Sequence, residues 1–143
     1  MKLTDIFIQS AGSGFNFEGF ERAGAKLFSK AVFPQVTLKH GSLVFNAHAV
    51  KTLDECSNIQ ILINMEKKSM VVKPCGENIY HSVQWSKVGK NSKVIPKIIY
   101  AKPFTGQLFY DMYWDFKGTV RILGRQIKDR NEKMLEFKLG ETL

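Results

Sequence analysis

The feature that most constrains this chain is an abrupt change of hydrophobic period within residues 41–53, GSLVFNAHAVKTL. Residues 42–45 are a β-prone run, whereas Val50 and Leu53 fall on one side of a helix that begins at Ala47. Asn46 stands at the boundary, where its side chain can accept a hydrogen bond from an amide of the first helical turn. We therefore predict a strand, an Asn46 N-cap and a short helix over residues 47–53, in immediate succession.

The flanking segments extend this pattern into a β-β-α-β-β unit over residues 36–74. Residues 36–39 and 58–64 favour strands, His40 and Gly41 favour a turn, and the polar residues 65–69 join the strand at 58–64 to one at 70–74. Later in the chain the pattern predicts a strand at residues 94–100, with Pro96 at a sheet edge, and a short helix at 104–113. It then predicts a hairpin made of strands at 119–127 and 134–139.

These elements predict an α+β fold made of small β-barrel-like modules of short strands, each with a short helix. We expect an N-terminal arm at residues 1–32, a first module at 33–76, and a second helix-plus-hairpin module at 77–143 packed on the first. The arm is rich in glycine and phenylalanine. It is expected either to pack on the body or on a second subunit, or to be a tail without fixed contacts.

Charge favours a polyanionic partner. The 143 residues carry 21 Lys and Arg against 13 Asp and Glu, a net charge of +8. Lysine far outnumbers arginine, which favours contacts to a phosphate backbone over the reading of base edges. The candidate nucleic-acid-binding residues are Lys39, His40, Lys51, Lys87, Lys90, Lys93, Arg121 and Arg125. The alternative is that these cations only solvate edge strands and turns.

The sequence offers little for catalysis. The histidines have no metal-ligand spacing with Cys56 or Cys75, and neither GxSxG nor HExxH occurs. We therefore expect a protein that is not an enzyme, with no cofactor, metal or small-molecule substrate. The aromatic residues Trp85, Trp114, Phe116 and Phe137 could stack on bases, but their positions favour core packing.

Two further patterns bear on location. No apolar run is long enough to cross a membrane, and the first residues do not form a typical signal peptide. The two cysteines are not in CxxC spacing and are expected to be free thiols in a reducing compartment. These patterns predict a cytoplasmic protein without a membrane partner.

Residues 36–74 resemble the swapped-hairpin domain of AbrB-type transcriptional regulators. The resemblance is carried by Gly41, the apolar triplet at 43–45, and Lys51, Thr52 and Leu53, followed by a hairpin. Ser42, Asn46 and Val50 stand where that family has a basic residue, a proline and an arginine. The resemblance implies that the short helix closes one end of a small barrel, which a second chain or the C-terminal module would complete.

The whole chain has a glycine- and phenylalanine-rich start and a late section with Trp114, Gly118 and LEFKLGET at residues 135–142. With these features it is also similar to small proteins of Firmicutes mobile elements. The leading hypothesis is a non-catalytic DNA-binding or accessory regulatory protein, acting as a homodimer and contacting mainly the phosphate backbone. The alternative is a structural or protein-interaction module that does not bind nucleic acid. The feature that discriminates the two hypotheses is whether Lys39, Lys51 and the loop at 87–93 lie on one continuous face.

Overall fold

The computed structural model describes residues 16–20 and 33–143 and divides the chain into two units, Met1–Lys30 and Ala31–Leu143. In the first unit, residues 16–20 form a tight turn, in which the Phe20 amide donates to the Phe17 carbonyl at 3.1 Å. The rest of the predicted arm lies outside the described residues.

The second unit consists mostly of strands. Its first half contains β1 Gln35–Lys39, β2 Ser42–Phe45, α2 Ala47–Thr52, β3 Asn58–Asn64 and β4 Ser69–Cys75. Its second half contains β5 Val83–Gln84, β6 Ser86–Val88, the 3₁₀ turn η2 Lys90–Ser92, β7 Val94–Pro96, β8 Ile99–Tyr100, α3 Lys102–Asp111, β9 Thr119–Asp129 and β10 Glu132–Thr142. The β-β-α-β-β order of residues 36–74 is confirmed.

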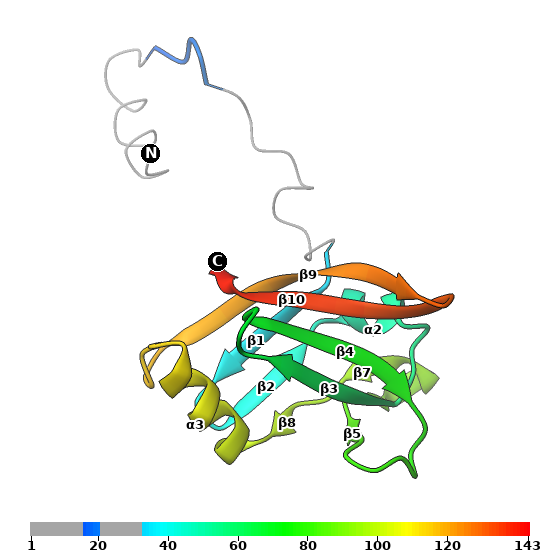
Figure 1. Cartoon of the computed structure of the whole chain (residues 1–143). Coiled ribbons are helices and arrows are strands. Elements are labelled where there is room, and N and C mark those ends of the chain that lie inside the picture. The colour runs from blue at the N-terminus through cyan, green and yellow to red at the C-terminus, as the bar shows by residue number, and fades with distance from the viewer. Residues whose placement is uncertain (1–15, 21–32) are drawn as a thin grey trace. The chain divides into compact units, whose positions relative to one another are not determined.

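Eight strands form one antiparallel sheet in the order β5-β3-β4-β10-β9-β1-β2-β8, and β6 pairs with β7 as a separate hairpin. Figure 1 shows the large sheet curling into a nearly closed, barrel-like shape. The C-terminal hairpin β9–β10 is inserted between β4 and β1, so strands from both predicted modules are neighbours in one sheet. This is a small, strand-rich α+β fold.

Asn46 connects the strand to the helix as predicted. Its Oδ1 accepts hydrogen bonds from the Ala49 amide at 2.9 Å and from the Gln35 amide at 3.0 Å, and its Nδ2 donates to the Phe33 carbonyl at 2.9 Å. One side chain therefore caps α2 and ties it to the start of β1. The helix ends as expected, because Asp54 and Glu55 adopt left-handed φ values of 58° and 57°.

The core lies inside the curled sheet. Trp85 is fully buried, its ring packs edge-on against Phe45 at 5.3 Å, and its Nε1 donates to the Cys56 carbonyl at 2.7 Å. The Phe137 ring also packs edge-on against Phe45, with the ring centroids 5.5 Å apart, and it lies over Gly124, where an added Cβ would come within 2.6 Å of the Phe137 ring. Trp85 and Phe137 are therefore core residues, as predicted.

Two element predictions were wrong in detail. Residues 94–100 form two short strands rather than one, because the chain turns at Lys97, whose amide donates to the Trp85 carbonyl at 2.9 Å. The second helix spans Lys102–Asp111 rather than 104–113, since Pro103 suits a first turn and the helix ends before Tyr113. Among the described residues, no helix is long and apolar enough to span a membrane.

Candidate functional site

The predicted cations fall into two groups, of which the first lies around the β1–β2 turn. Lys39 pairs with Thr119 of β9, and Arg121 is two residues further along β9 on the same outer face. His40 follows Lys39 in the turn, and its ring packs edge-on against Phe116 at 5.0 Å.

The β1–β2 turn is held against α3. The Gly41 amide donates to Thr105 Oγ1 at 2.7 Å, and this hydroxyl donates to the Ala101 carbonyl at 2.9 Å. Thr105 is fully buried, so the contact has a fixed geometry. Gly41 itself has a φ of 113°, which explains why glycine occupies this turn.

The second group lies on the β6–β7 hairpin and on α2. Lys87, Lys90 and Lys93 are all exposed, and Lys90 and Lys93 flank the tip of the hairpin. Lys51 is exposed on α2, which lies against β7. These four lysines therefore come from adjoining elements.

The two groups are at different ends of the sheet. Asn46 holds the start of α2 at the Gln35 end of β1, whereas Lys39 is at the other end, about 13 Å further along an extended strand. Figure 1 likewise shows α2 and β7 away from α3. The structure thus brings Lys51 together with the 87–93 loop and places Lys39, His40 and Arg121 elsewhere. The single continuous face expected of Lys39, Lys51 and the loop is therefore not formed, and only the second group gathers cations from adjoining elements.

Arg125 is paired with a carboxylate, so we assign it to neither group of free cations. Its guanidinium contacts Glu136 through Nη2 at 2.6 Å and Nε at 2.8 Å. The Nε hydrogen bond holds the pKa of the Glu136 carboxyl below its usual range, against the opposing effect of partial burial. Ser69 adds a second hydrogen bond to the same carboxylate at 3.0 Å.

Two acidic residues also border the second group of cations. Lys87 lines a shallow hollow of about 240 Å³ together with Glu55 and Glu77. Lys90 and Lys93 are outside that hollow. In the described part of the chain the ion pairs join Lys73 to Glu132, Arg125 to Glu136 and Lys133 to Asp54, so they use none of the β6–β7 lysines.

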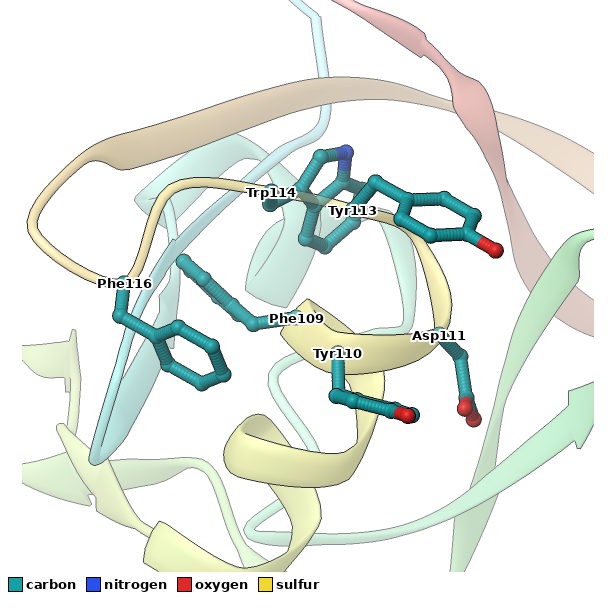
Figure 2. Close-up of a pocket in the computed structure, with 6 residues that line it drawn as sticks. All are labelled: Phe109, Tyr110, Asp111, Tyr113, Trp114 and Phe116. Atoms are coloured by element: carbon teal, nitrogen blue, oxygen red, sulfur yellow. The ribbon is translucent and has the colours of Figure 1, made fainter.

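Sequence reasoning missed an aromatic pocket at the C-terminal end of α3. The pocket has a volume of about 360 Å³ and is lined by Phe109, Tyr110, Asp111, Tyr113, Trp114 and Phe116 (Figure 2). Trp114 packs edge-on against the buried Phe109 at 5.2 Å, whereas Phe116 is 47% exposed. The core prediction therefore fails for Phe116. The run FYDMYWDF was the available signal, because its aromatics exceed what one buried helix face can cover.

A second surface is an apolar groove on the outside of the sheet. It has a volume of about 350 Å³, and its apolar lining includes Leu62, Val71, Ile127 and Met134 from four neighbouring strands. Leu62 is half exposed at 49%. Outer-face residues of a solvated sheet are usually polar, so this groove departs from the alternation expected of such strands.

The described residues contain no group of three or more His, Cys, Asp or Glu side chains placed to hold a metal ion. Cys56 and Cys75 are both free thiols. Burial raises the pKa of the Cys56 thiol, and burial also raises the pKa of the Cys75 thiol.

Comparisons of the chain with family models, with curated proteins and with solved structures found no match.

Proposed function

We propose that this chain is a non-catalytic nucleic-acid-binding or accessory regulatory protein that contacts phosphates through the β6–β7 hairpin and α2. One observation carries the proposal: Lys51, Lys90 and Lys93 are exposed on adjoining elements and belong to none of the ion pairs formed among the described residues. The sequence around the hairpin reinforces it, because residues 78–110 contain no Asp or Glu.

The physical basis is electrostatic. Exposed lysines act as point charges toward phosphate oxygens and release counterions when they bind, which makes the affinity salt-dependent. The hairpin extends from the buried Trp85 and Ser86, so its base is anchored in the core while the lysines at and near its tip remain in solvent. DNA is the proposed partner, and contacts to the backbone are expected to dominate over sequence reading.

The same proposal includes four further points: a likeness to AbrB-type domains, a homodimer, a regulatory role on a mobile element and a cytoplasmic location. The observed β-β-α-β-β order supports the likeness, and the free cysteines agree with a reducing compartment. In this chain the β9–β10 hairpin already lies beside β1 and β4, so a dimer would use another surface.

The test is a titration of duplex DNA at two salt concentrations with matched charge variants. The triple variant Lys87→Gln, Lys90→Gln, Lys93→Gln lowers the net charge from +8 to +5. So does the control triple variant Lys67→Gln, Lys128→Gln, Lys138→Gln, whose lysines are exposed elsewhere. We expect the hairpin variant alone to flatten the slope of log K against log salt by about 0.9 per lost phosphate contact.

Equal slopes for both variants would refute the proposed site, and no binding at low salt would refute nucleic-acid binding altogether. The alternative function is a protein-interaction module, and the groove of Leu62, Val71, Ile127 and Met134 favours it. Two results together would support that alternative: dimers that the Val71→Lys variant no longer forms, and no binding to DNA.

A further inference from the structure

The aromatic pocket at the end of α3 is distinct from the cationic hairpin and has a different chemistry. Five of its six lining side chains are aromatic, and the sixth is the carboxylate of Asp111. The lining contains no Lys, Arg or His. Phosphates and other anions are therefore poor ligands for it, although the chain as a whole is strongly basic.

We propose that this pocket binds a small organic cation with a methylated ammonium head group. The faces of aromatic rings carry negative quadrupole potential and attract such cations, and a nearby carboxylate adds to the attraction. The pocket volume of about 360 Å³ lies at the lower end of the range for small-molecule sites, about 300–1,000 Å³.

The helix end supplies a second attraction. Asp111 is the last residue of the ten-residue helix α3, at the negative end of the helix dipole, and the last turn contains no basic residue. A carboxylate at this position destabilises its own helix unless a cation is near. In the described part of the chain Asp111 forms no ion pair and accepts one hydrogen bond, from Gln107 Nε2 at 2.9 Å.

Within residues 16–20 and 33–143, the Tyr110 and Tyr113 side chains make no hydrogen bond and no ring contact. Tyr110 is 71% exposed and Tyr113 is 95% exposed, and Tyr113 also adopts a left-handed φ of 57°. This φ belongs to the C-terminal turn of α3, in which the Trp114 amide donates back to the Phe109 carbonyl at 2.9 Å, and the turn leaves the Tyr113 ring in solvent. Figure 2 shows the Phe109 and Phe116 rings on one side of the end of α3 and the Tyr110 and Asp111 side chains on the other.

Choline and its neutral isostere 3,3-dimethylbutan-1-ol provide the decisive comparison, because they share a shape and differ in charge. Trp114 fluorescence is followed while choline chloride replaces sodium chloride at constant ionic strength. Trp85 is fully buried, so the Trp114→Phe variant should give no response and thereby assigns the signal. We expect choline to bind about tenfold or more tightly than the isostere.

Variants separate charge from ring. Asp111→Asn keeps the acceptor for Gln107 and should weaken choline binding without altering the fold, and Phe116→Leu should weaken it by removing a ring. Tyr100→Leu removes an exposed tyrosine outside the pocket and should leave it unchanged.

Equal affinity for choline and the isostere would overturn the proposal, as would no response to choline. A Trp114 response to a single-stranded oligonucleotide but not to choline would also overturn it and assign the pocket to nucleic acid. Because the ligand is a cation and the readout is Trp114, failure here is distinguishable from failure of the hairpin to bind DNA.

Discussion

Asn46→Ala tests the hydrogen bonds by which one side chain connects β1 and α2. The substitution removes the acceptor for the Ala49 amide, which caps α2, and leaves the Gln35 amide without its partner. Loss of an N-cap costs about 1 kcal/mol, and an unsatisfied amide that is partly buried costs about 1–3 kcal/mol. The expected loss in the free energy of unfolding is therefore about 2–4 kcal/mol.

Urea unfolding followed by tryptophan fluorescence measures this loss, because Trp85 lies in the core near the end of α2. The midpoint should fall while the slope m stays constant, since the folded surface is unchanged. Asn46→Asp keeps both Oδ1 contacts and loses only the donation to Phe33, so it should lose less than about 1 kcal/mol.

The matched control is Asn64→Ala, which removes an exposed hydrogen bond from the Lys67 amide in the β3–β4 turn. Its loss should stay below about 1 kcal/mol. If Asn46→Ala is no more destabilising than Asn64→Ala, or if Asn46→Asp is as destabilising as Asn46→Ala, the two hydrogen bonds accepted by Asn46 Oδ1 do not stabilise the fold.

The remaining predictions concern the C-terminal hairpin. Gly124→Ala should destabilise by about 1–3 kcal/mol, because its Cβ would meet the rigid, buried ring of Phe137 at 2.6 Å. Adding Phe137→Leu should recover part of that loss in a double-mutant cycle, and strict additivity of the two losses would disprove the contact. The second prediction concerns the pH dependence of stability. The pKa of Glu136 is lower in the folded protein than in the unfolded chain, so ionised Glu136 stabilises the fold at pH values above its unfolded pKa of about 4.3. This stabilisation is lost as the pH falls through the folded pKa. Glu136→Gln should therefore be less stable than the wild type in urea unfolding at neutral pH and nearly equal to it in acid, whereas a difference independent of pH would argue against the Arg125 pair as its cause.

The candidate surfaces show where sequence reasoning stops. Residue type correctly marked Lys51, Lys90 and Lys93 as exposed cations, because lysine is rarely buried. Their grouping was not readable, since it depends on α2 lying against β7, a contact between residues far apart in sequence. The aromatic pocket was missed for the same reason, because the helix period does not show which rings the core leaves uncovered.

The sequence by itself determined the local elements of this protein. The strand at 42–45, the Asn46 cap, the short helix and the hairpin at 58–74 follow from period, capping chemistry and turn composition, which act over a few residues. Only the tertiary structure decided that β9–β10 lies between β4 and β1, and which cations and rings share a face. Strand order is set by the burial of side chains from distant segments around Trp85 and Phe45, and no local pattern encodes that choice.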